Sequence, residues 1–285
     1  MLQERFAAAF GEAAREYEQG RPGYPAEALD ALTREFGLDR RSVVVDLAAG
    51  TGKLTRDLTR RFETVIAVEP LAEMREQLRR GVPEAQAYEG VAERIPLPAA
   101  SSDAVFVAQA FHWFDGRRAL AEIARVLRPG GGLALVWNTT PWERRQGAWF
   151  ARVDDLLERS RADLSVMRRH SSGRWREAFE GDRQFGPLSQ ATFDNTQRLS
   201  PEEFLANLAS RSYIACLDPG RRQELLAEVA DLLGQPGAPV EASRVVVPMR
   251  TEAFWTRVGT GWRSAAARPQ PAQREERTGT ADPLP

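Results

Sequence analysis

The sequence has very few of the residues that form disulfides or bind zinc. Cys216 is its only cysteine, so the 285-residue chain cannot form an internal disulfide. It has only two histidines, His112 and His170. One cysteine and two histidines cannot supply the four ligands of a structural Cys/His zinc site. A fold held together by disulfides or by such a zinc site is therefore excluded.

The sequence also lacks an excess of charge of one sign, and it lacks long apolar runs. The chain carries 39 Lys and Arg against 40 Asp and Glu, a formal net charge of −1, so no broad field favours nucleic acid or an acidic membrane. No apolar run approaches the roughly 20 residues of a membrane-spanning helix. Residues 1–16 carry charges throughout instead of the apolar stretch of a signal peptide. We therefore expect a cytoplasmic protein, a monomer or a homodimer, that binds neither nucleic acid nor membranes.

Short apolar strands alternate with helical segments in the first half of the chain. This alternation is typical of an α/β fold, in which a parallel sheet has helices on both faces. The predicted strands are 43–47, 64–68, 85–89, 103–110 and 133–137, and the predicted helices are 25–36, 53–62, 71–80 and 117–127.

The pattern changes after Asn138. Residues 142–180 are mostly helical in character, and the polar segment 189–200 has the pattern of a strand. Ser200, Pro201 and Glu203 form a helix-start signature. Residues 221–233 and 244–258 follow as a helix and a final strand. We divide the chain into a cap segment 1–24, a core 25–138, a helical lid 139–200, C-terminal helices with the last strand 201–265, and a tail 266–285 with the composition of disorder.

The stretch VVVDLAAGTGKLTRDL, residues 43–58, reads as a strand, a glycine turn and a helix. Gly50 and Gly52 let the backbone turn tightly and bring its amides close to a ligand at the helix N-terminus. A nucleoside triphosphate, a dinucleotide and S-adenosylmethionine (SAM) are all candidates. A P-loop is excluded because Leu54, not Ser or Thr, follows Lys53. The third glycine of a dinucleotide turn is replaced by Thr55, which weakens that alternative without excluding it.

Two acids help to choose among these ligands. Asp46 lies near the end of the first strand, ahead of the glycine turn, where a carboxylate would repel a pyrophosphate but would suit the ammonium of a methionine moiety. Glu69 ends the second strand, and a carboxylate there can accept two hydrogen bonds from ribose hydroxyls. This spacing of two acids around a glycine turn favours SAM.

With these features in place, the sequence resembles the class I SAM-dependent methyltransferases, within the small-molecule branch that includes trans-aconitate methyltransferase-like proteins. The resemblance covers residues 17–138 and rests on VVVDLAAGTGKLT, VIAVEP, EGVAERIPLPAASSDAVFVAQAFHWFD and EIARVLRPGGGLALVWN. It implies a Rossmann-like, doubly wound, mostly parallel sheet of seven strands with a helical lid insertion. The chain departs from the family at Ala48, where a glycine is usual, and at Val91, where an Asp often precedes Ala-Glu.

The resemblance also implies the residues that contact the cofactor. These are Asp46, Ala48, Gly50 and Gly52 at the methionine end; Glu69 at the ribose; Pro70 and Leu71 beside the adenine; Ala92 and Glu93 at its polar edge; Gln109 and Ala110 at the end of the fourth strand; and Tyr17 and Arg21 at the SAM carboxylate.

His112 is the candidate catalytic residue, because it follows the fourth strand where the methyl group should point. It would act as a base or orient the acceptor by hydrogen bonding, and simple packing is the alternative. We predict no metal. An aromatic acceptor pocket could form from Trp113, Trp137, Asn138, Trp142, Trp149 and Phe150, although core packing explains the aromatic residues equally well.

The sequence therefore predicts an enzyme that transfers a methyl group from SAM to a small organic molecule. A SAM-binding regulator without turnover and, less favoured, an NAD-dependent oxidoreductase remain as alternatives.

Overall fold

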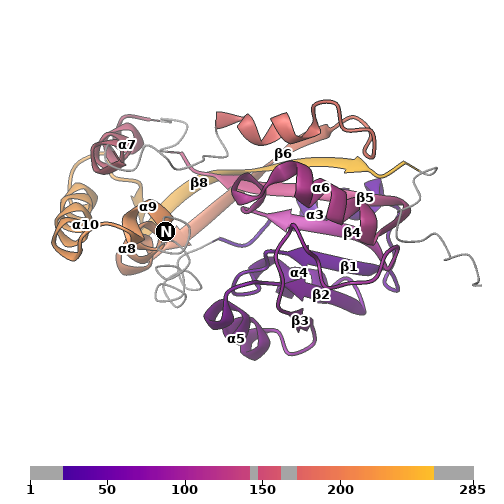
Figure 1. Ribbon diagram of the computed structural model, residues 1–285. Coiled ribbons are helices and arrows are strands. Elements are labelled where there is room, and N and C mark those ends of the chain that lie inside the picture. Colours follow the sequence, from indigo (N-terminus) through magenta and orange to yellow (C-terminus); the bar gives the residue numbers. More distant parts are fainter. Residues whose placement is uncertain (1–21, 142–146, 162–171, 260–285) are drawn as a thin grey trace, which may run out of the picture.

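A computed structural model describes residues 22–141, 147–161 and 172–259 of the chain. They form one sheet in the order β3-β2-β1-β4-β5-β8-β6, with the short β7 paired to β8 (Figure 1). The strands are β1 Val43–Leu47, β2 Thr64–Val68, β3 Gln86–Tyr88, β4 Ser102–Ala108, β5 Leu127–Thr139, β6 Ser189–Leu199, β7 Val240–Glu241 and β8 Arg244–Arg257.

Strands β1 to β5 pair in parallel, whereas β8 runs antiparallel to β5 and β6. The mostly parallel, doubly wound sheet is thus confirmed. Seven strands lie along its continuous path as expected, and the two-residue β7 is an additional eighth. The strand order changes direction beside β1, which pairs with both β2 and β4. Open α/β sheets bind ligands at such a switch point, beyond the carboxyl ends of the strands.

Helices cover both faces of the sheet. Helices α3 and α4 pack on one face, and α6 with the 3-10 helix η4 packs on the other. None of the helices in the described ranges is long and apolar enough to cross a membrane. The helices are α3 Ala26–Glu35, α4 Lys53–Thr59, α5 Ala72–Gly81, η1 Phe111–Trp113, α6 Gly116–Val126, α7 Ala148–Arg161, η4 Arg174–Phe179, α8 Pro201–Ala209, α9 Ser212–Ala215 and α10 Pro219–Leu233.

Strand β5 begins earlier than the predicted 133–137, because the RPGGG segment is itself extended. Its Gly132 lies directly under α3. A Cβ atom there would be 2.4 Å from Cδ1 of Phe36, closer than two carbon atoms can approach. Glycine at this position therefore lets the helix pack flat on the sheet.

The distal halves of β6 and β8 extend past the end of β5. The pairing of β5 with β8 stops at Thr139 and Arg250, whereas β6 and β8 remain paired as far as Leu199 and Val245. Helices α7 to α10 gather around this overhang (Figure 1). Residues of α7, α8, α10 and the overhang form a second hydrophobic cluster. Strand β6 confirms the strand predicted at 189–200, so the helical region drawn over 139–200 ends before residue 189.

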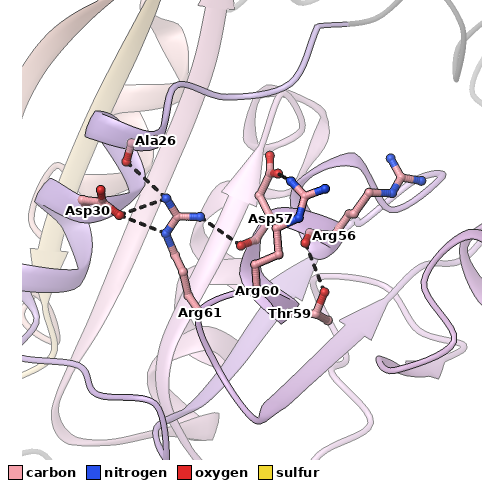
Figure 2. Close-up of polar contacts among 7 residues, drawn as sticks. All are labelled: Ala26, Asp30, Arg56, Asp57, Thr59, Arg60 and Arg61. Atoms are coloured by element: carbon pink, nitrogen blue, oxygen red, sulfur yellow. Dashed lines mark hydrogen bonds and ion pairs between the residues drawn. The ribbon is translucent and has the colours of Figure 1, made fainter.

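A cluster of arginines and acids fastens α3 to α4 (Figure 2). The Arg61 guanidinium donates to Asp30 at 2.9 and 3.0 Å, and to the carbonyls of Asp57 and Ala26 at 3.1 and 3.4 Å. Arg60 binds the Asp57 carboxylate at 3.0 Å. Partial burial nevertheless raises the pKa of Asp57. The cluster holds the beginning of α3 beside the helix that follows the glycine turn.

Candidate active site

The turn between β1 and α4 contains three residues in the left-handed region of backbone space. Ala48 has φ 59°, Gly50 has 58° and Gly52 has 89°. A Cβ atom on Gly52 would lie 3.0 Å from Cγ of Leu78, so the turn also needs glycine for its close approach to α5. Gly52 is the residue that precedes the first turn of α4. The backbone of this turn therefore lies directly at a helix N-terminus, as predicted.

Asp46 is buried beneath this turn, with 1% of its surface exposed. Its Oδ2 accepts a hydrogen bond of 2.6 Å from the hydroxyl of Thr55, and its Oδ1 is buried without a hydrogen-bond partner. Burial raises the pKa of Asp46 to about 7; the Thr55 bond opposes this rise, and the neighbouring Glu69 adds to it. A buried carboxylate oxygen with no partner is costly unless a ligand supplies one.

Glu69 at the end of β2 reaches back to the glycine turn. Its Oε2 accepts from the amide of Gly50 at 2.8 Å, and its Oε1 accepts from the amide of Leu71 at 2.9 Å. Burial raises the pKa of Glu69, while these two amides and Arg75 lower it. A carboxylate has about four acceptor sites, so it can bind two ribose hydroxyls in addition to the amides.

Arg75 of α5 holds the ends of β2 and β3 together. Its guanidinium donates to the carbonyls of Glu69 and Pro70 at 2.7 and 3.1 Å and forms an ion pair of 2.8 Å with Glu89. Pro70 is exposed, and Leu71, which precedes α5, is half-buried. These two residues border the same edge of the sheet as the Glu69 carboxylate, where the adenine side of the ligand was predicted.

In the loop after β3, Ala92 and Glu93 were predicted to contact the polar edge of the adenine, and their side chains also have structural roles. Ala92 is buried in the core, at 4% exposure. The Glu93 carboxylate accepts a hydrogen bond of 2.7 Å from the amide of Asp115, the residue that caps α6. That hydrogen bond holds the loop against the segment after η1. One of the acceptor sites of the Glu93 carboxylate therefore has a structural role. The loop amides near Ala92 remain the predicted contacts for adenine.

The same loop is held from the other side by α6. Arg125 donates to the carbonyls of Ile95 and Leu97 at 2.8 and 2.7 Å, and Glu122 accepts from the amide of Ile95 at 2.9 Å. Arg125 and Glu122 also bind each other at 2.8 Å. The bond from Arg125 lowers the pKa of Glu122. This pair fixes the backbone that follows Ala92 and Glu93.

His112 lies in η1, directly beyond the carboxyl end of β4. Gln109, which precedes η1, has φ 60°, and its side-chain amide donates to the Asn138 carbonyl at 3.3 Å. Ala110 is the residue before η1 and is half-buried. The half-buried imidazole accepts a hydrogen bond at Nδ1 from Nε1 of Trp137 at 3.3 Å, and its ring lies 5.0 Å from that of Trp113. These contacts join the segment after β4 to the end of β5.

Comparison with known proteins agrees with this geometry. Residues 45–135 match a family model described as a methyltransferase domain. An uncharacterized methyltransferase of Mycobacterium tuberculosis is 39% identical over 242 residues, which cover 85% of this chain and 92% of that protein. The chain belongs to the methyltransferase family.

Other methyltransferases are similar to this chain over a longer stretch than the residues matched by the family model. A methyltransferase-like protein of Schizosaccharomyces pombe is 37% identical over 218 residues, 76% of this chain and 82% of that protein. The solved structure of a candidate type II methyltransferase from Anaeromyxobacter dehalogenans aligns with a TM-score of 0.55 at 28% identity, covering 84% of this chain and 97% of that one. The similarity therefore extends beyond residues 45–135.

Two of the predicted acceptor-pocket tryptophans are core residues of this methyltransferase. Trp137 is 1% exposed and packs against Trp175, with ring centroids 4.8 Å apart. Trp149 packs in the second cluster beside Phe150 and donates to the Leu232 carbonyl at 2.9 Å. The sequence shows that a residue is aromatic but not which face it covers, so it does not separate a core tryptophan from one that lines a pocket. Tyr17, Arg21 and Trp142 lie outside the described residues.

Asn138 also has a structural role. Its Oδ1 accepts from Thr251 at 2.6 Å and from Asn195 at 3.2 Å, and its Nδ2 donates to the Gly23 carbonyl at 3.1 Å. Asn195 binds the same carbonyl at 3.2 Å. This network fastens the chain ahead of α3 across β5, β8 and β6.

Sequence reasoning missed several residues that support the methyltransferase site. Thr55 was noted only as a missing glycine, although a hydroxyl in the first turn of a helix after an acid-ended strand was a usable signal. No sequence signal indicates the contacts that come from distant parts of the chain, since these depend on how the elements pack. The missed supporting residues are Thr55, Arg75, Glu122, Arg125 and Asn195.

Proposed function

We propose that this methyltransferase uses SAM as its methyl donor and a small organic molecule as its acceptor. The observation that carries the proposal is the buried Oδ1 of Asp46, which has no hydrogen-bond partner and lies under the glycine turn. An ammonium group suits such an oxygen, because it brings both a hydrogen bond and the opposite charge. The methionine end of SAM carries that ammonium.

The remaining cofactor contacts follow from the positions of the other side chains. Glu69 would accept from the two ribose hydroxyls, with its carboxylate already oriented by the amides of Gly50 and Leu71. Pro70 and Leu71 would border the adenine, and amides near Ala92 would bind its polar edge. Bound SAM would supply an electrophilic methyl group with a thioether as its leaving group, and the residues named here would hold and orient it.

A dinucleotide suits this turn less well. Its pyrophosphate would lie at the N-terminus of α4, where Asp46 and Glu69 both present carboxylates. In place of a third glycine the helix has Thr55, whose hydroxyl holds Asp46. Two carboxylates at this position would repel an anionic ligand group and attract a cationic one.

The acceptor would lie beyond the ends of β4 and β5, near His112. The chain's part in the reaction is to hold the acceptor in line and to exclude water. The nearly balanced charge gives no reason to expect a polyanionic acceptor such as nucleic acid. A small organic acceptor therefore fits best.

The test is a screen of the full-length protein with methyl-labelled SAM against carboxylates, phenols, amines and a metabolite extract, followed by mass spectrometry. We expect transfer of label to one compound class, and weaker transfer by a Glu69→Ala variant at limiting SAM. Binding of SAM without transfer to any compound would overturn the enzyme assignment and favour a SAM-binding regulator. Absence of SAM binding would overturn the cofactor assignment.

A further inference from the structure

The direction of one hydrogen bond determines which nitrogen of His112 carries its proton. The indole Nε1 of tryptophan is a donor only. Because Trp137 donates to Nδ1 of His112 at 3.3 Å, Nδ1 must be unprotonated. A neutral imidazole with an unprotonated Nδ1 carries its proton on Nε2. In this form Nε2 can donate a hydrogen bond but cannot accept a proton.

Trp137 is held so firmly that this donor cannot easily turn away. Its side chain is fully buried, and its ring lies 4.8 Å from that of Trp175 and 5.9 Å from that of Phe254. Its own strand, β5, is paired with β4 on one side and β8 on the other. Rotation of the indole would therefore disturb the packing between the sheet and η4.

We infer that Trp137 is a positioning residue that keeps His112 in its Nε2-protonated form, so that His112 meets the acceptor as a hydrogen-bond donor and not as a base. The inference rests on the proposed function, since it concerns the acceptor side of the same site. It gives Trp137 a role in the site through its N–H group alone. The packing of its ring is a separate, structural role.

The inference narrows the class of acceptor. His112 would donate to an acceptor oxygen that is already anionic, such as that of a carboxylate or a phenolate. The acceptor's own lone pair would form the new bond to the methyl carbon, and no proton would pass to His112. An acceptor that must first lose a proton would need a different base.

The test is a two-bond ¹H–¹⁵N correlation spectrum of the full-length protein at neutral pH. The chain has only two histidines, so a His170→Gln variant leaves the His112 signals alone in the spectrum. We expect the neutral form with Nε2 protonated. Finding Nδ1 protonated would overturn the inference, whatever the protein methylates.

A Trp137→Phe variant tests whether the N–H group of Trp137 sets the tautomer of His112. It keeps most of the ring and removes the N–H group, so the Nδ1-protonated form should become detectable. An unchanged spectrum in a folded variant would show that Trp137 does not set the tautomer. If this variant does not fold, the Trp137 indole proton of the wild type remains informative: its resonance should shift when His112 is replaced by Ala, and no shift would overturn the inference. Binding of S-adenosylhomocysteine, measured separately, should be unchanged in Trp137→Phe, so failure of the cofactor assignment remains distinguishable.

Discussion

The Thr55 hydroxyl donates a hydrogen bond of 2.6 Å to Oδ2 of Asp46. Thr55 lies in α4 and Asp46 in β1, so the bond spans the glycine turn from its first helical turn to the strand before it. It occupies one carboxylate oxygen and leaves Oδ1 as the buried oxygen without a partner. Thr55 therefore orients the acid that we expect to bind the ammonium of SAM.

Replacing Thr55 by Val should weaken this orientation. The substitution keeps the side-chain shape and removes the donor, which should cost about 1–3 kcal/mol of unfolding free energy, the usual range for a buried hydrogen bond to an acid. Affinity for S-adenosylhomocysteine should fall as well. Thr55→Ser retains the hydroxyl and is the matched control. Equal melting temperatures and affinities for the two variants would contradict the role of the hydroxyl.

Binding of S-adenosylhomocysteine should release a proton near neutral pH. Without ligand, the pKa of Asp46 is raised to about 7 by burial, and a bound ammonium favours the carboxylate and lowers that pKa again. Affinity should therefore rise as the pH increases through about 6 to 7. Calorimetry in buffers of different ionisation heat measures the released proton. An Asp46→Asn variant should show none from this site, and equal release by wild type and variant would refute the assignment.

In the absence of ligand, the contribution of Asp46 to the free energy of unfolding should decrease as the pH rises. A salt-bridged acid, whose folded pKa is lowered, shows the opposite dependence. The folded pKa of Asp46 lies above its unfolded value of about 3.9, so the folded state binds more protons between the two values. Its contribution to stability is thus present below about pH 4 and is lost as the pH rises toward 7. Asp46→Asn should therefore be more stable than wild type at pH 8, with the difference shrinking at low pH. The free energies of unfolding of both proteins can be measured by chemical denaturation. A difference between wild type and Asp46→Asn that stays constant from low pH to pH 8 would contradict this prediction.

Ala48 occupies a position that suits glycine. Its φ of 59° costs an alanine roughly 1–2 kcal/mol. Ala48→Gly should therefore raise the melting temperature, although glycine loses more entropy on folding and reduces the gain. Ala49→Gly, in the same turn but outside the left-handed region, is the control and should be neutral or destabilising. Differential scanning calorimetry would contradict the account if both variants lost stability equally.

The parts of this methyltransferase that were predictable from sequence are those set by local pattern. The alternation of apolar strands with helices gave the sheet, and the Ser200–Glu203 capping box is formed at the start of α8 with both of its hydrogen bonds. Asp46 follows from its position at a strand end just before the glycine turn, and Glu69 from its position at the end of the next strand. Each of these signals lies within a few residues of the feature that it predicts.

The parts that were not predictable depend on contacts between distant segments. Nothing near Trp137 in the sequence distinguishes a buried ring that contacts His112 from the wall of a pocket. The network of Asn138 joins Gly23, Asn195 and Thr251 through pairings that exist only once β6 and β8 are in the sheet. Likewise, the hydrogen bond from the Asp115 amide to Glu93 depends on how α6 packs. These roles follow from topology and register, which the local pattern does not specify.

A calorimetric titration of S-adenosylhomocysteine into the full-length protein, with NAD titrated in parallel, tests the central claim most directly. We predict one site per chain in the micromolar range and no binding of NAD. Glu69→Ala removes the acceptor of the ribose hydroxyls and of the Gly50 amide, so affinity should fall by at least about tenfold, as expected for about 1.5–3 kcal/mol. The exposed Glu228→Ala of α10 should bind as wild type does. Binding of NAD in place of S-adenosylhomocysteine, or an unchanged affinity in Glu69→Ala, would contradict the account.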